Sequence, residues 1–414
     1  MQALHNLLPT GSHTGCGMRA AIIGAGLGGL LAANLLAKEG YKVDVFEKLP
    51  FIGGRFTNLT YKGFELSTGA LHMIPHGKRG PLGSLLKELK VDVEIKDSKP
   101  EGEALYNDKR EILTKKVAPF KTLMKFYAKS LIHKFFGRDF YLNEFQKGID
   151  EFSGKFIDAF LGWSLSITSR EILFSKFLKI YQQTMRFRGP GIPIGGCKAV
   201  IDGLVENLKS YDGKIHLRKK VEGIVVESAK AKGVIVKNER IDCDLVISNV
   251  GHYETQKLVG KDYLGYLKMK LSESSGIKYS IALNEPFIGH SGVLFTLDAQ
   301  RIAGLNEVTN ADPNLAPNGK HLLMAHQPML TSNVKYEISL GLKDLKRILN
   351  GYNYEILVVQ SYTDGWPVNR VKAGMDIGVE TPYTNLFVVG DGAKGDDIEV
   401  DGIALGVLRF GELI

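Results

Sequence analysis

The stretch AAIIGAGLGGLLAANL, residues 20–35, decides the fold. Its apolar beginning is typical of a strand that is covered on both faces, and its end is typical of a helix. Between them lies a turn that is rich in glycine, namely Gly24, Gly26, Gly28 and Gly29. A second apolar run follows at residues 42–46, so the segment predicts a strand, a turn, a helix and a second strand.

The turn has the features of a dinucleotide site. Gly24 makes the turn tight, Gly26 lets backbone N–H groups approach a pyrophosphate, and Gly29 lets the helix pack closely on the strand. Leu27 opens the helix, whose N-terminus carries partial positive charge toward the phosphates. Glu47 lies 23 positions after Gly24, where its carboxylate can accept hydrogen bonds from both hydroxyls of an adenosine ribose. Glu47 would repel a 2′-phosphate, which disfavours NADP.

The segment KLPFIGGRFTN, residues 48–58, follows the second strand. Lys48 begins it, Gly54 permits close backbone approach, and the Arg55 guanidinium can lie against a diphosphate. An exposed arginine on a turn is the alternative for Arg55. This segment alone does not separate FAD from NAD.

A later segment favours FAD. Residues 386–392, LFVVGDG, form another buried-type strand that ends at Gly390 and Asp391. Ligands of open α/β sheets lie at the carboxyl ends of strands, and an aspartate there suits a ribityl chain, which FAD has and NAD lacks. Val400 and Gly402 lie at the turn before an apolar helix, whose N-terminus suits the electron-rich edge of a flavin ring.

The motifs GAGLGG…FEK, GGR and LFVVGDG together resemble those of FAD-dependent oxidoreductases of the phytoene desaturase and amine oxidase type. The segments at 191–226 and 243–252 resemble the branch of phytoene desaturases, carotenoid isomerases and retinol saturases. The resemblance implies FAD as cofactor and an adenine contact from the backbone of Val221. It also implies an α/β fold with a Rossmann-like FAD-binding domain of the glutathione reductase type and an inserted α+β substrate domain.

One segment departs from the family pattern. Where the family has glycines and a proline beside the flavin ring, this chain has GDDIEVDG at residues 395–402. Its four acids are expected either near the ring, which disfavours a bulky apolar substrate, or on an exposed loop.

We expect the FAD-binding domain to be assembled from residues 18–80, 192–270 and 374–414. The insertion at 81–191 is expected to be mostly helical. The insertion at 271–373 is expected to be strands with one helix, and the two insertions together form the substrate domain. Residues 1–17 are interpreted as a leader or a cloning remnant outside the fold.

Composition limits the function classes. Three cysteines without a CxxC pair argue against a zinc site or a disulfide framework, so we predict no metal and a cytoplasmic location. The net charge of +8 is not accompanied by a nucleic-acid-binding module, which disfavours nucleic acid as a partner. Residues 118–141 are both basic and aromatic at helical spacing. They are interpreted either as a packed helix of the substrate domain or as a peripheral membrane contact.

The resemblance implies hydride transfer at flavin N5 with an apolar, isoprenoid- or carotenoid-like substrate, through desaturation, saturation or isomerisation. His72 is the candidate residue near the substrate, with a structural core histidine as the alternative. Trp366, Pro367 and Arg370 are expected to line the far side of the site. Two other functions stay open: a flavin amine oxidase, and a flavin-free carrier of prenyl chains like the Rab GDP-dissociation inhibitors. The oligomeric state is not predicted.

Overall fold

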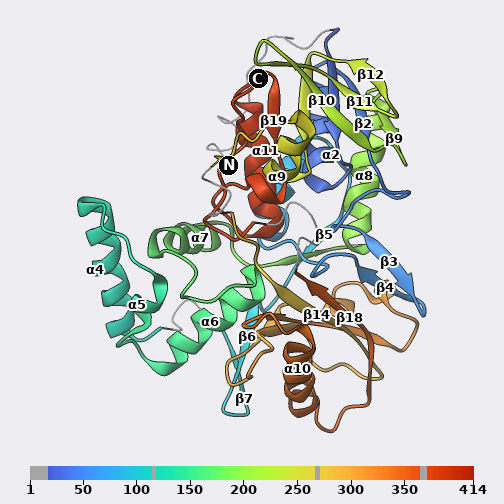
Figure 1. Cartoon of the computed structure of the whole chain (residues 1–414). Coiled ribbons are helices and arrows are strands. Elements are labelled where there is room, and N and C mark those ends of the chain that lie inside the picture. The colour runs from blue at the N-terminus through green and yellow to red at the C-terminus, as the bar shows by residue number, and fades with distance from the viewer. Residues whose placement is uncertain (1–16, 114–117, 266–270, 364–370) are drawn as a thin grey trace.

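The computed structural model describes residues 17–113, 118–265, 271–363 and 371–414. The expectation for residues 1–17 therefore falls almost wholly outside the described residues, and that for Trp366, Pro367 and Arg370 falls entirely outside them. The two largest sheets of the described chain are one parallel and one mainly antiparallel sheet, with a group of helices beside the second (Figure 1).

The first sheet is parallel, with the strand order β19-β13-β1-β2-β9. Its strands are β1 (Arg19–Ile23), β2 (Lys42–Phe46), β9 (Lys214–His216), β13 (Leu245–Ser248) and β19 (Leu386–Val388). The predicted unit of strand, turn, helix and strand is confirmed, because β1 and β2 are parallel neighbours and α2 (Leu27–Lys38) connects them. Helix α2 is buried almost throughout, since α8 (Gly196–Ser210) and α11 (Glu399–Gly411) pack against it. The carboxyl ends of β1, β2 and β19 consequently meet at one edge.

The second sheet has seven strands in the order β18-β14-β17-β16-β15-β6-β7. Their bounds are β6 (Gly102–Tyr106), β7 (Lys109–Ile112), β14 (Gly276–Leu283), β15 (Val293–Thr296), β16 (Gly304–Glu307), β17 (His321–Pro328) and β18 (Tyr354–Tyr362). The strands and the helix expected in the second insertion are confirmed by β14, β17, β18 and α10 (Val334–Ile348).

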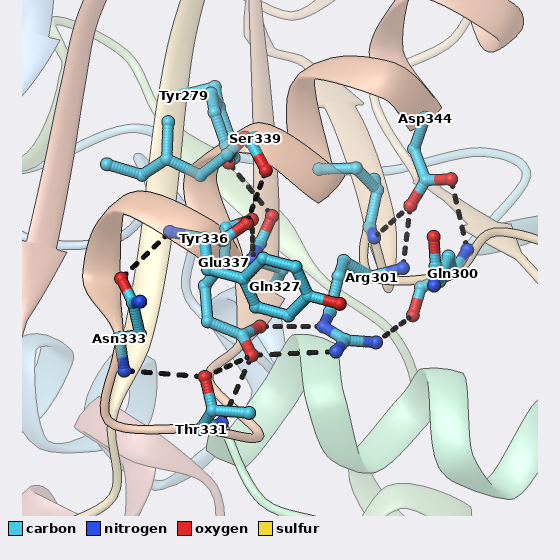
Figure 2. Close-up of polar contacts among 12 residues, drawn as sticks. Tyr279, Gln300, Arg301, Gln327, Thr331, Asn333, Tyr336, Glu337, Ser339 and Asp344 are labelled. Carbon is cyan, nitrogen blue, oxygen red and sulfur yellow. Dashed lines mark hydrogen bonds and ion pairs between the residues drawn. The ribbon is translucent and has the colours of Figure 1, made fainter.

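Polar contacts join α10 to this sheet (Figure 2). The buried Glu337 carboxylate accepts from Arg301 Nε at 2.6 Å, and Asp344 accepts from the backbone N–H of Arg301 at 2.6 Å. Tyr279 donates its hydroxyl to Gln327 at 2.9 Å. Gln327 of β17 in turn donates to the Glu337 carbonyl oxygen at 3.1 Å, and together with the charge-assisted carboxylate bonds it holds α10 against the sheet.

The first insertion is less uniform than expected. Its helices are α4 (Phe120–Phe136), α5 (Leu142–Gln146), α6 (Glu151–Leu165) and α7 (Phe174–Phe187), but β6 and β7 join the seven-stranded sheet. Helix α3 (Pro81–Glu88) instead packs against α11, and Leu82, Leu85 and Leu86 belong to the core around the parallel sheet. This packing favours a domain boundary after residue 91 over one at residue 80, and the division into domains stays a proposal.

Smaller elements complete the fold. They are the antiparallel sheet of β10 (Val221–Glu227), β11 (Lys230–Val236) and β12 (Glu239–Asp242), the hairpin of β3 (Asn58–Tyr61) and β4 (Phe64–Ser67), the pair of β5 (Ile95–Asp97) and β8 (Gly191–Pro193), and α9 (Gly251–Val259). Among the described helices, none is long and apolar enough to cross a membrane.

Candidate functional site

A cavity of about 1300 Å³ begins at the carboxyl edge of the parallel sheet and extends to the helices of the first insertion. Twelve residues expected to bind the cofactor line it: Gly24, Gly26, Leu27, Gly28, Glu47, Lys48, Gly54, Arg55, Val221, Gly390, Asp391 and Val400. Pockets for one drug-sized ligand are about 300–1000 Å³. This cavity therefore has room for a dinucleotide and a second molecule.

Two residues that were expected to contact the cofactor, Gly29 and Gly402, lie behind the cavity wall instead. A Cβ on Gly29 would lie 2.2 Å from the carbonyl oxygen of Gly24, and one on Gly402 would lie 2.9 Å from that of Asp397. Neither residue lines the cavity. For Gly29 this agrees with the predicted packing role, whereas the contact predicted for Gly402 is replaced by packing inside the loop that precedes α11.

The glycine turn forms a cradle of bare backbone. A Cβ on Gly28 would lie 2.7 Å from Cα of Gly390, so the first and the last strand ends touch. Gly26 is the N-cap of α2 and gives no side-chain cap, which leaves the first N–H groups of the helix to an outside acceptor. Such a helix start binds phosphate, and the residues present therefore fit the diphosphate of FAD.

Glu47 is held rigidly at the end of β2. It is 7% exposed, and its two carboxylate oxygens accept from the backbone N–H groups of Ala25 and Leu49, both at 2.8 Å. A carboxylate has about four acceptor sites, so each oxygen keeps capacity for a further donor. The side chain is thus positioned to accept from ribose hydroxyls without further rearrangement.

A group of charged side chains connects the segment after β2 with the segment after β19. Asp391 accepts from Arg55 Nη2 at 2.6 Å and from Lys394 Nζ at 2.7 Å. Burial by itself would raise the pKa of Asp391, but the charges of Lys394 and Arg55 outweigh burial and hold it well below its usual range. The charges of Asp376 and Glu399 also act on Lys394, so the two cations are balanced by several carboxylates. Asp376, whose pKa burial raises to about 6, lies near Lys394.

A second buried cluster was missed at the sequence level. His76 lines the cavity, and its ring lies between Asp397 Oδ1, at 2.8 Å from Nε2, and the Arg188 carbonyl oxygen, at 2.8 Å from Nδ1. Both neighbours are acceptors, so the ring is held as an imidazolium. Burial would lower the pKa of His76, but the hydrogen bond and charge of Asp397 raise it to about 9. Asp401 accepts from the backbone N–H groups of His76 and Leu82.

These contacts show where the four acids of residues 395–402 lie relative to the cavity. Asp397 and Asp401 lie on neither an exposed loop nor the cavity surface, because both are buried against the segment around His76. Asp396 is 39% exposed and pairs with Lys176 and Lys179 of α7. Glu399 does line the cavity. Three of the acids thus anchor the start of α11 and do not line the cavity.

His72 is not placed in the cavity. Its side chain is fully buried, Nε2 lies 2.7 Å from the Glu65 carbonyl oxygen, and Nδ1 accepts from the backbone N–H of Cys197 at 3.1 Å. Burial lowers the pKa of His72 to about 4, so the ring is neutral. These contacts correct the suggested role near the substrate and favour the structural alternative, since both ring nitrogens already bind backbone.

The wall that contains Gly69 and Ala70 is held by a buried lysine. Lys278, on β14, donates to the carbonyl oxygens of Ser67 at 2.6 Å and Gly69 at 2.8 Å. Burial lowers the pKa of Lys278 to about 7. Gly69 and Ala70 line the cavity, so Lys278 positions backbone that faces the site.

The part of the cavity away from the glycine turn is aromatic. Its lining includes Phe145, Phe156, Phe160, Trp163, Phe177 and Phe295. These side chains come from α5, α6, α7 and β15, so both sheets and the helices contribute to one cavity. Sequence reasoning missed them because aromatic residues at helical spacing are also the ordinary signature of a core.

Comparison with known proteins agrees with this geometry. The family model of flavin containing amine oxidoreductases matches residues 27–395. The chain belongs to that family. It is therefore an FAD-binding oxidoreductase, and its enzymatic nature and cofactor agree with the prediction from the motifs.

Two relatives match most of the chain. An uncharacterized protein of Methanocaldococcus jannaschii is 47% identical and the match covers 95% of this chain and 98% of that protein. A solved oxidoreductase of Methanosarcina mazei is 44% identical, with a TM-score of 0.88 over 95% of this chain and 100% of its own. A phytoene desaturase of Cereibacter sphaeroides is 26% identical over 56% of this chain and 53% of its own. A solved putrescine oxidase, 17% identical with a TM-score of 0.71, shares the fold.

Proposed function

We propose that this oxidoreductase acts on an apolar substrate of the isoprenoid or carotenoid type, by desaturation, saturation or isomerisation. Bound FAD would supply hydride transfer at its N5 atom. The observation that carries the proposal is the aromatic part of the cavity, where six aromatic side chains from α5, α6, α7 and β15 line the same cavity as the cofactor cradle. The distant relatedness to carotenoid desaturases supports the same substrate class.

The chain's own residues have three tasks in this proposal. The Gly26 turn and the pair of Arg55 and Asp391 hold the diphosphate and ribityl parts of the cofactor. Phe160, Trp163 and Phe295 exclude water and align a hydrocarbon chain by contact. The proposal includes a peripheral contact of residues 118–141 with a membrane, which is developed below.

A flavin amine oxidase is the second candidate. It rests on the shared family and on the fold of the putrescine oxidase. An amine requires acidic or aromatic groups that bind a cation, and the aromatic part of this cavity could contact an ammonium through its rings. The flavin-free carrier is not retained, because the family consists of flavin-containing oxidoreductases.

Anaerobic mixing experiments separate the candidates. FAD-loaded protein is mixed with detergent-dispersed phytoene or other polyenes, and separately with putrescine, while flavin absorbance is followed; reduced protein is mixed with the same polyenes. We expect polyenes to reduce the oxidised flavin (desaturation), reoxidise the reduced flavin (saturation) or be converted into an isomer without net flavin change (isomerisation, followed by the polyene's own spectrum), and Phe160→Asp to abolish the conversion while FAD is retained. Leu342→Asp on the exposed face of α10 is the matched control. Flavin reduction by the amine alone would overturn the proposal in favour of an amine oxidase.

A further inference from the structure

Helix α4 presents an apolar stripe to solvent. Phe120 is 78% exposed, Tyr127 60% and Phe135 70%, and Met124 and Leu123 lie between them at 50% and 43%. Their spacing of three, four and eight residues places them on one side of the helix. The sequence pattern was compatible with a helix packed on the protein through this side, but the structure leaves the side uncovered. Figure 1 shows α4 at the edge of the molecule, far from the parallel sheet.

The opposite side attaches the helix to the protein. The Phe126 ring lies 5.4 Å from that of Phe174 and 5.0 Å from that of Tyr181, measured between centroids. Thr122, the buried residue of the helix, donates to Asp150 at 2.8 Å. The outward orientation of the apolar stripe is therefore set by specific contacts and is not a loose arrangement of the helix.

Lysines flank the stripe. Lys121, Lys125 and Lys129 follow one another at intervals of four residues. Lys121 and Lys134 are exposed, whereas Lys125 donates to the Lys147 carbonyl oxygen and Lys129 lies 4.8 Å from the Phe140 ring centroid. Like charges at this spacing repel one another, and burial together with Lys129 and Lys121 lowers the pKa of Lys125. An anionic surface against this side of α4 would relieve that repulsion. An apolar stripe between basic flanks is the pattern of helices that lie in a membrane interface.

The cavity reaches the surface beside this stripe. Leu123 of α4 and Tyr181 and Met185 of α7 line the cavity, and their side chains are 43%, 38% and 43% exposed. Thr122 and Phe126 line it as well. One opening of the aromatic part of the cavity thus lies between α4 and α7, next to the exposed apolar side chains.

We propose that α4 docks this protein on an anionic lipid bilayer and holds the cavity opening against it, so that an apolar substrate passes from the bilayer into the cavity. Docking is carried by the stripe and the lysines. Passage of substrate rests on the proposed function. The basic net charge of +8 favours the same anionic partner.

Vesicle co-sedimentation tests the docking without substrate or turnover. Full-length FAD-loaded protein is mixed with vesicles of phosphatidylcholine alone or mixed with phosphatidylglycerol, at several salt concentrations. A lysine near an anionic surface contributes about a fivefold gain in binding, so K121Q/K134Q, which removes the two exposed lysines, should lower partitioning to the anionic vesicles roughly 25-fold. The variant F120S/Y127S/F135S should also lose binding, because the apolar contact is removed.

The control variants carry the same types of substitution on the exposed side of another helix, α10. K335Q/K343Q on α10 removes the same number of exposed charges and should bind like the wild type. Y336S/L342S on α10 is the apolar control. Docking is overturned if anionic vesicles do not bind the wild type, or if the α4 and α10 lysine variants bind equally. It is also overturned if the wild type self-associates and F120S/Y127S/F135S becomes monomeric without any loss of vesicle binding, since a second copy would then cover the stripe.

The vesicle result is separate from the proposed function. A protein that docks but never converts polyenes would retain the docking surface and lose the proposed substrate. A protein that oxidises detergent-dispersed polyenes but does not bind vesicles would retain the substrate and lose the docking surface.

Discussion

Replacing Asp391 by asparagine should strongly destabilise the cofactor-free protein. The carboxylate is 6% exposed and lies 2.6 Å from Arg55 and 2.7 Å from Lys394. Asparagine keeps the shape but leaves two cations facing each other in a buried place, with Asp376 as a partial counter-charge. Removing one partner of a buried ion pair costs about 3–5 kcal/mol, and we expect Asp391→Asn to lower the free energy of unfolding by this amount.

The matched control is Asp396→Asn, five positions further along the same loop. Asp396 also pairs with two lysines, but its side chain is 39% exposed. Surface pairs of this kind contribute about 0–1 kcal/mol. Chemical denaturation of the FAD-free proteins, followed by intrinsic fluorescence, measures both variants. If Asp391→Asn loses no more than Asp396→Asn, the buried charges do not stabilise the empty site and our account of Arg55 and Lys394 is wrong.

Three further predictions test other parts of the site. Gly29→Ala should abolish FAD retention after gel filtration, since a Cβ would lie 2.2 Å from the Gly24 carbonyl oxygen; full flavin absorbance would refute the packing argument. The pKa of His76 rises from 6.5 to about 9 on folding, so its charge stabilises most below pH 6.5 and is lost as pH rises through 9. The stability margin of wild type over His76→Gln should therefore shrink by about 2 kcal/mol between about pH 7 and 10 in denaturation titrations, and a constant margin would exclude a stabilising imidazolium. Lys278→Met should cost about 1–3 kcal/mol by the same titration, because it leaves the Ser67 carbonyl oxygen without its donor and the Gly69 carbonyl oxygen with only the Ser67 hydroxyl, whereas wild-type stability would show that other contacts hold that wall.

The nucleotide unit could be predicted because its signals are local. The strand, glycine turn, helix and Glu47 lie within thirty residues, and each step has its own steric or electrostatic reason. The lining positions at Arg55, Val221 and Asp391 were likewise found through short motifs. A motif of this kind specifies backbone geometry directly, so little depends on distant partners.

The parts that could not be predicted depend on partners far along the chain. Asp397 binds His76 across 321 positions, and nothing near either residue signals the other. Strand β6 pairs with β15 from another insertion, so its segment could not be recognised as part of a sheet. In α4 the periodicity identified a helix, but the contacts of Phe126 and Thr122 with distant residues decide which side faces the protein.

The parallel sheet has a consequence for the order of events during synthesis. Its edge strand β19, Asp391 and α11 all come after residue 385, whereas β1 and the phosphate turn are made first. A nascent chain can thus form the glycine turn early, yet the far wall of the cofactor site is missing until the last segment leaves the ribosome. Until then α11 does not cover α2, so the apolar surface of α2 is exposed and can bind chaperones or aggregate. Capture of FAD therefore requires β19 and α11 to have been made and packed, long after the glycine turn.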